Sequence, residues 1–224
     1  QFHKLIIKSQ DMLSVPLINI ADINRADLVL EKMQNIQKNN ISTVNWPELY
    51  PSKPEVAFKI AHDGSNIFLQ FFVEENEILA KTAEDNGHVW TDSCVEFFIS
   101  FDGLYYYNTE FSCIGKALMG YRKEKKDSRH ASPVILDSIK RYPSLGIEPF
   151  DKKQGDFKWN LLLVIPVTAY WMSDLKSLNG IKAHANFYKC GDNLTIPHFL
   201  SCNPIHTEKP NFHVPQFFGE LNFE

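Results

Sequence analysis

The chain has 224 residues, a formal net charge of −4 and 44% hydrophobic residues. This length suits one large all-β domain or two small domains, and the apolar fraction is enough for a substantial core. The slightly negative charge gives no electrostatic reason to expect binding to nucleic acid or to an anionic membrane. No run of about 18 apolar residues is present, so we expect no membrane span. The start at Gln1 shows no charged-then-apolar leader, which suits a mature exported chain.

The first element expected in chain order is a helix, and the remainder is expected to be strands. Between Ala21 and Lys38 apolar residues recur at loosely helical spacing, with Asp22 as a candidate N-cap. After this segment, short apolar runs alternate with turn signals such as Asp63-Gly64 and Asp102-Gly103. The expected strands are Val56–Ala61, Ile67–Val73, Ile78–Thr82, Val95–Phe101, Tyr105–Ile114, Ala117–Tyr121, Pro133–Asp137, Trp159–Ile165, Ile181–Lys189, His198–Ser201 and Phe217–Phe223.

This pattern predicts the fold class. Many short strands with regular turns are typical of a β-sandwich, and we find no internal repeat, low-complexity segment or linker. We therefore predict a single domain over residues 1–224. It is expected to be all-β, an antiparallel β-sandwich of the immunoglobulin-like or jelly-roll type with a short peripheral helix.

The most informative segment is a predicted hairpin in the middle of the chain. Residue alternation puts Val95 and Phe97 on an apolar face and Glu96 on the opposite face. The register that matches these faces on the partner strand places Asn108 and Glu110 beside Glu96. Such an acidic face suits a flat polar ligand, and sugars are the commonest ligands of this kind.

Three other interpretations of this hairpin remain open. Taken alone, the polar face favours an ordinary solvent-facing sheet over a recognition surface. Cross-strand carboxylates such as Glu96 and Glu110 also satisfy the spacing of about 5–9 Å that a glycosidase needs. The sequence shows no apolar pocket to raise a carboxyl pKa, which argues against that enzyme. A haem-binding or protein-interaction domain on a related sandwich is the third interpretation.

The cysteines and the charged run carry weaker signals. The four cysteines show no zinc-ligand spacing, and although their even number permits two disulfides, a domain of this size does not need them. The hairpin register puts Cys94 and Cys113 on opposite faces, which argues against a bridge between them. The run Arg122–Arg129 is expected to be a solvated loop, with a phosphate or acidic-partner site as the alternative.

Three segments resemble carbohydrate-binding module family 9. They are Trp90–Ile99, Trp159–Pro166, and the C-terminal pair Ser201–Pro204 and Pro215–Leu221. The resemblance covers residues 45–224. It implies a β-sandwich that binds saccharides, sometimes holds calcium and is often appended to glycan-degrading enzymes. It also implies a secreted, periplasmic or cell-surface bacterial protein.

The resemblance also implies roles for particular residues. Family members clamp a sugar ring between two tryptophans, and Trp90 falls on the first of these positions. Cys202 stands at the expected position of the second tryptophan, and an expected arginine is missing near Glu110. Phe98, Tyr106 and Phe212 are possible substitutes for the missing ring. The candidate sugar-binding residues are Trp90, Glu96, Asn108, Glu110 and Asn186.

These observations predict a non-catalytic saccharide-binding module that supports glycan breakdown, with a glycan-degrading enzyme as its partner. No catalytic residue is assigned, and no metal ligand can be named. Calcium is the one ion that the resemblance suggests.

Overall fold

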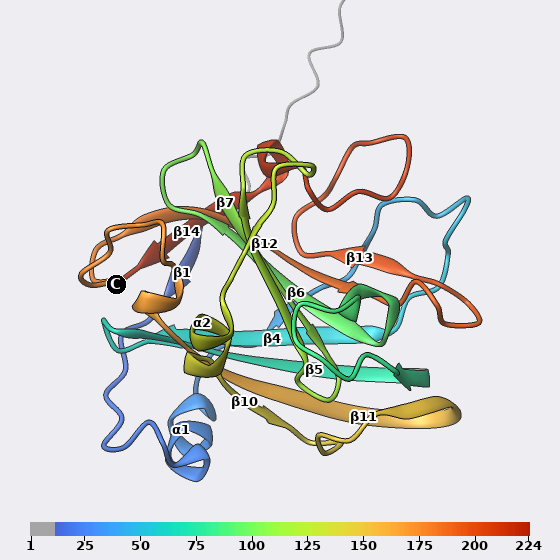
Figure 1. Cartoon of the computed structure of the whole chain (residues 1–224), viewed down its shortest axis with the longest axis horizontal. Coiled ribbons are helices and arrows are strands. Elements are labelled where there is room, and N and C mark those ends of the chain that lie inside the picture. The colour runs from blue at the N-terminus through green and yellow to red at the C-terminus, as the bar shows by residue number, and fades with distance from the viewer. Residues whose placement is uncertain (1–11) are drawn as a thin grey trace, which may run out of the picture.

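The computed structural model describes residues 12–224, and the start at Gln1 lies outside the described residues. Two β-sheets pack against each other, as Figure 1 shows. The larger sheet has nine strands, in the order β1-β14-β12-β6-β7-β8-β9, with β13 joined to β12 and β3 joined to β13. The smaller sheet has five strands, in the order β10-β11-β5-β4-β2. These two layers confirm the predicted β-sandwich.

The strands vary greatly in length. Those of the larger sheet are β1 (Leu13–Val15), β3 (Thr43–Val44), β6 (Cys94–Ser100), β7 (Tyr106–Ser112), β8 (Ala117–Arg122), β9 (Arg129–His130), β12 (Lys182–Cys190), β13 (Phe199–Ser201) and β14 (Gly219–Phe223). Those of the smaller sheet are β2 (Asn39–Asn40), β4 (Glu55–His62), β5 (Asn66–Ala80), β10 (Lys140–Pro143) and β11 (Phe150–Pro166). The helical elements are α1 (Ala26–Met33), α2 (Pro133–Ser138), and the 3₁₀ turns η1 (Val89–Thr91), η2 (Val167–Ala169) and η3 (Pro215–Phe217).

The main core lies between the sheets and follows from the period of two along each strand. Val95, Phe97 and Ile99 of β6 are fully buried in it, as the alternation predicts. The rings of Phe58 and Phe97 both stack with Phe187, with centroid distances of 3.7 and 4.9 Å. Stacked aromatic pairs of this kind join strands of both sheets into one hydrophobic layer.

The hairpin register is as predicted. Glu96 pairs with Glu110, and Phe98 pairs with Asn108, in the antiparallel ladder between β6 and β7. Cys94 and Cys113 lie in different hydrophobic clusters on opposite sides of the larger sheet, and all four cysteines are free thiols.

The outer face of the larger sheet differs from expectation because it is covered rather than open to solvent. Glu96 and Glu110 are 3% and 4% exposed, not surface carboxylates. A second hydrophobic cluster covers this face, and the chain between β13 and β14 supplies Ile205, Phe212 and Val214 to it. This segment, orange to red in Figure 1, has no strand period, so the sequence pattern could not predict that it folds back over the sheet.

The peripheral helix is confirmed, but it is shorter than the predicted segment. Helix α1 spans eight residues and packs Val29 and Met33 against Phe68 on the outer face of the smaller sheet. The predicted N-cap is wrong, because Arg25 occupies the N-cap position without a side-chain bond. The carboxylate of Asp22 instead accepts a hydrogen bond from the backbone N–H of Asn24, at 2.9 Å.

Residues 133–137 form a helix, which corrects the predicted strand. Pro133 occupies the first turn of α2 after Ser132, a position that its fixed φ favours. Leu136 is buried while Val134 is 79% exposed, so the segment buries one side of a single helical turn. The predicted strands Ile67–Val73 and Ile78–Thr82 also prove to be one strand, β5, which pairs with β11 through two register shifts.

Among the described residues, no helix is long and apolar enough to cross a membrane.

Candidate ligand-binding site

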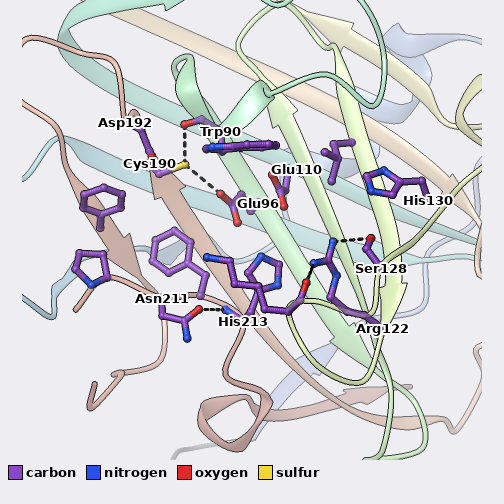
Figure 2. A pocket seen from close by; sticks show the side chains of 15 residues that line it. Trp90, Glu96, Glu110, Arg122, Ser128, His130, Cys190, Asp192, Asn211 and His213 are labelled. Atoms are coloured by element: carbon purple, nitrogen blue, oxygen red, sulfur yellow. Dashed lines mark hydrogen bonds between the residues drawn. The ribbon is translucent and has the colours of Figure 1, made fainter. Parts of the chain in front are cut away.

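A cavity of about 430 Å³ opens on the covered face of the larger sheet. Its walls come from β6, β7, β8 and the end of β12, and from loops on either side of them. Figure 2 shows the indole of Trp90 edge-on, with Glu96 and Glu110 beneath it and Arg122 and His213 on the far side. The cavity therefore combines an aromatic wall, a floor of two glutamates and the guanidinium of Arg122 opposite them.

Trp90 lies on the 3₁₀ turn that leads into β6, and it is half-buried. The turn is fixed by the buried carboxylate of Asp92, which accepts hydrogen bonds from the backbone N–H groups of Lys81 and Thr82 at 3.0 and 2.9 Å. The imidazole of His88 contacts the indole with a centroid distance of 4.5 Å. The ring is thus held in place before any ligand arrives, which lowers the entropic cost of binding.

Glu96 and Glu110 are cross-strand neighbours whose charges are poorly solvated. Burial, then the neighbouring Cys190 thiol and Glu110, raise the pKa of Glu96 well above its usual range. Burial raises the pKa of Glu110 to about 7, although its hydrogen bond from Asn108 lowers it in part. No pattern in the sequence indicates an apolar pocket that would raise a carboxyl pKa, and the covering loops provide one.

Asn108 and Asn186 are fully buried, and neither lines the cavity. The Nδ2 of Asn108 donates to Oε1 of Glu110 at 2.9 Å, so Asn108 orients that carboxylate. The Oδ1 of Asn186 accepts hydrogen bonds from the N–H groups of Phe187 and Asn203, both at 2.9 Å. Asn186 therefore fixes the chain after β13, whereas Trp90, Glu96 and Glu110 face the cavity.

Arg122 forms the basic part of the wall, at the end of β8. Its Nη1 donates to the carbonyl of Lys125 at 2.6 Å, and its Nη2 donates to the hydroxyl of Ser128 at 2.8 Å. Gly120 makes room for this arrangement, because a Cβ there would lie 2.7 Å from Oδ1 of Asn108 and 2.9 Å from Nη2 of Arg122.

Three buried polar atoms around the cavity have no hydrogen-bond partner within the described part of the chain. They are Oδ1 of Asn108, Oε2 of Glu110 and Nε of Arg122. A buried polar atom without a partner typically costs about 1–3 kcal/mol, so such atoms are rare in folded proteins. Glu110 and Arg122 line the cavity, so their unpaired acceptor and donor could pair with hydroxyl groups of a ligand, since a hydroxyl both donates and accepts.

His213 is a partly buried histidine of the cavity wall that sequence reasoning did not single out. One of its ring nitrogens, Nδ1, shares a hydrogen bond of 3.0 Å with the hydroxyl of Tyr106. Burial, and then the positive charges of Arg122 and Lys125, lower the pKa of His213 to about 3. The ring is therefore neutral in the folded protein at ordinary pH.

Acid should destabilise the protein partly through His213. A histidine in the unfolded chain has a pKa of about 6.5. Below that pH the unfolded state therefore binds a proton at His213, whereas the folded state does not. The free energy of unfolding then falls as the pH drops from about 6.5 towards 3. At pH 5 we expect the loss to be about 2 kcal/mol larger for the wild type than for His213→Asn.

Urea titrations at several pH values measure this difference. The exposed His184 offers a matched position, and His184→Asn controls for the loss of an imidazole as such. Equal profiles for the wild type and His213→Asn would contradict the prediction.

The family resemblance implied a second tryptophan at the position of Cys202 and an arginine near Glu110, and the structure shows what lies in the cavity instead. Cys202 does not line the cavity, because it packs against the main core. Of the possible substitute rings, Phe212 lines the cavity, and one face of it stacks on Tyr188 at 4.2 Å. The expected arginine is absent from β7, where Glu110 stands, and the cavity instead receives Arg122 from β8. The alternation along β8 places Arg122 on the same face as Gly120 and Leu118, and this signal could have revealed it.

Comparisons with known proteins agree with this architecture. The model of carbohydrate-binding family 9 matches residues 25–223. The chain belongs to carbohydrate-binding family 9. The crystal structure of a candidate carbohydrate-binding protein from Bacteroides uniformis is 42% identical, covers 95% of this chain and 99% of that chain, and has a TM-score of 0.92. A search of the curated proteins found no match.

Two more distant family 9 modules share the fold. Both come from Caldicellulosiruptor kristjanssonii, one in complex with glucose and one in complex with cellotriose. The glucose complex is 13% identical with a TM-score of 0.55, and each chain is covered over 95% of its length. The cellotriose complex is 12% identical with a TM-score of 0.57, with coverage of 95% of this chain and 92% of that one.

Calcium was the ion implied by the family resemblance. Within residues 12–224, the group of acidic, histidine and cysteine side chains whose ligand atoms converge is Cys94, Glu96 and Cys190. Two sulfurs and one carboxylate do not suit calcium, which takes about six to eight oxygen ligands. Calcium binding therefore stays a prediction from the family resemblance, and this group of side chains does not support it.

Proposed function

We propose that this family 9 domain is a non-catalytic module that binds a saccharide in the cavity beside Trp90. The observation that carries the proposal is a half-buried indole in the same cavity as two residues, Glu110 and Arg122, that each have a buried polar atom without a partner. An aromatic face suits the C–H face of a sugar ring, and convergent polar groups suit its hydroxyls.

The binding energy must come from more than one group. One sugar face on one indole hides on the order of 100 Å² of apolar surface, which is worth about 2.5 kcal/mol. Association costs at least about 4 kcal/mol in lost freedom. Glu110 and Arg122 line the cavity and can form hydrogen bonds with the ligand, and Phe212 can add apolar contact. These interactions would supply the binding free energy that the indole alone does not. We infer that Glu96 and Glu110 accept hydrogen bonds from hydroxyls while Arg122 donates one.

A screen of the full chain on a glycan array tests the proposal, followed by calorimetry with glucose and cellotriose. These two sugars are the ligands of the structurally similar modules from C. kristjanssonii. We expect saturable retention on at least one glycan, and the free sugar should compete it away. Failure to bind any glycan, in a sample whose circular dichroism shows a folded β-protein, would overturn the proposal.

A second candidate function has one specific observation in its favour. Glu96 and Glu110 are cross-strand carboxyls whose pKa values are raised by burial, and a glycosidase needs one such acid beside a second carboxylate. Measurement of released reducing sugar separates the two functions. Turnover by the wild type that Glu96→Gln abolishes would indicate an enzyme. No turnover by either chain would favour the non-catalytic, saccharide-binding function.

Export and partnership stay predictions from the family resemblance. We propose a secreted, periplasmic or cell-surface location in a bacterium and a glycan-degrading enzyme as the partner. Cell fractionation of the native host, followed by detection of the chain in each fraction, tests the location.

A further inference from the structure

Two cysteines and one carboxylate meet at the edge of the cavity. Cys94 and Glu96 are two residues apart on β6, so their side chains share a face of the sheet. Cys190 on β12 is the direct cross-strand partner of Cys94. The three ligand atoms all lie within 4.8 Å of one another, and all three residues are buried. The Sγ of Cys190 donates to Oε1 of Glu96 at 3.0 Å, as Figure 2 shows.

We propose that Cys94, Glu96 and Cys190 form a binding site for a thiophilic divalent cation, with Zn²⁺ as the ion to test. Thiolate sulfur is a soft ligand that selects zinc and similar ions over calcium and magnesium. This site borders the cavity beside Trp90 and shares Glu96 with the proposed saccharide site, but the proposal does not rest on saccharide binding.

The geometry suits a tetrahedral ion. Zinc–sulfur and zinc–oxygen bonds of about 2.3 and 2.0 Å place neighbouring ligand atoms about 3.5–3.8 Å apart. The three atoms already lie within 4.8 Å, so rotation of side chains at fixed backbone positions brings them to these separations. Because β6 and β12 are adjacent in the middle of the larger sheet, the ladder holds the three Cα positions rigidly.

One coordination position would face the cavity. Glu96 and Cys190 line the cavity, whereas Cys94 lies behind them in the second hydrophobic cluster. Three protein ligands with the fourth position open to solvent are typical of zinc sites that keep a water ligand. The carboxylate of Asp192 also lines the cavity beside this cluster, and its negative charge favours a cation there.

Binding exchanges protons for the ion. Sulfur binds such an ion as a thiolate, so each thiol loses its proton on binding. Each thiol releases one proton to solvent when its sulfur binds the ion, and Glu96 releases a third if its carboxyl is protonated. The ion then faces two thiolates and one carboxylate, so affinity should increase with pH.

Titration of the reduced full-length chain with Cd²⁺ and Co²⁺, followed by competition with Zn²⁺, tests the site. Thiolate ligands give these ions sulfur-to-metal charge-transfer absorption, which carboxylates alone do not give. We expect one ion per chain, displacement by Zn²⁺, and release of protons into a weakly buffered solution. A phosphine reductant keeps the cysteines reduced without adding a competing thiol.

The variants identify the ligands. Cys190→Ser should weaken Zn²⁺ binding roughly 100-fold or more, since even an outer-shell partner typically contributes 10- to 100-fold. Glu96→Gln removes no thiol, so it should keep the charge-transfer band and weaken the affinity. Cys202→Ser is the matched control, because this partly buried cysteine packs against the main core and should leave binding unchanged.

Two results would overturn the proposal. One is the absence of a charge-transfer band in the reduced, folded wild type. The other is an unchanged band and affinity in both Cys190→Ser and Glu96→Gln. Mass spectrometry after alkylation confirms that all four cysteines are reduced before the titration begins.

Discussion

Replacement of Trp90 by alanine should remove detectable retention of the domain on any glycan that the wild type binds. The indole is the half-buried aromatic wall of the cavity, and its contact with a sugar ring is worth about 2.5 kcal/mol. A loss of this size lowers the affinity by roughly 70-fold. If the wild type has a dissociation constant in the micromolar range, the variant would bind so weakly that washing removes it from the array.

The fold should survive this change, because Trp90 lies on a turn at the edge of the second hydrophobic cluster. Tyr105→Ala is the matched control, since Tyr105 is a 39% exposed aromatic residue on the hairpin turn and does not line the cavity. It should retain wild-type binding. Calorimetry with the best array ligand measures both variants, and equal affinities for Trp90→Ala and the wild type would place the saccharide elsewhere on the molecule.

The sequence predicted the floor of this cavity because strand periodicity is a local signal. Once Val95, Phe97 and Ile99 are assigned to the core, the period of two forces Glu96 to the other face. Pairing with β7 then brings Glu110 beside it, and the structure has this register. The face was predictable, but its burial was not.

Burial of that face depends on contacts between distant parts of the chain. Phe212 and Val214 come from a segment without regular secondary structure, more than a hundred residues after β6. No periodic pattern connects the two, so the raised carboxyl pKa values could not be anticipated. The pairing of Cys94 with Cys190 has the same origin, because it requires knowing that β6 lies beside β12.

Replacement of Lys189 by methionine should lower the free energy of unfolding by about 3–5 kcal/mol, because it leaves a buried carboxylate without its counter-charge. Lys189 is fully buried, and its Nζ lies 2.9 Å from Oε2 of Glu75 on the opposite sheet. The contact is an ion pair rather than an aligned hydrogen bond. The ammonium also donates to Nε2 of His198 at 2.8 Å, which requires a neutral imidazole.

The neutral state of His198 fits this network, because burial and the nearby Lys189 charge lower its pKa to about 2. Trp159 completes the arrangement by donating its Nε1–H to Oε1 of Glu75 at 2.8 Å. Residues of β12, β5 and β11 are therefore joined by one buried polar network inside an apolar sandwich. Networks of this kind are costly to break singly, since each remaining member stays buried without its partner.

The same two strands of the smaller sheet supply the control. Lys158 and Glu74, each next in sequence to a member of the buried network, form a surface ion pair at 2.7 Å whose side chains are 76% and 47% exposed. Lys158→Met should therefore change stability by less than about 1 kcal/mol. The double variant Lys189→Met/Glu75→Gln should recover much of the loss, because it leaves no buried charge without a partner and the new amide oxygen can still accept the hydrogen bond from Trp159. Urea unfolding of the wild type, the two single variants and the double variant measures these differences in the free energy of unfolding. A loss below about 1 kcal/mol for Lys189→Met alone would contradict the prediction.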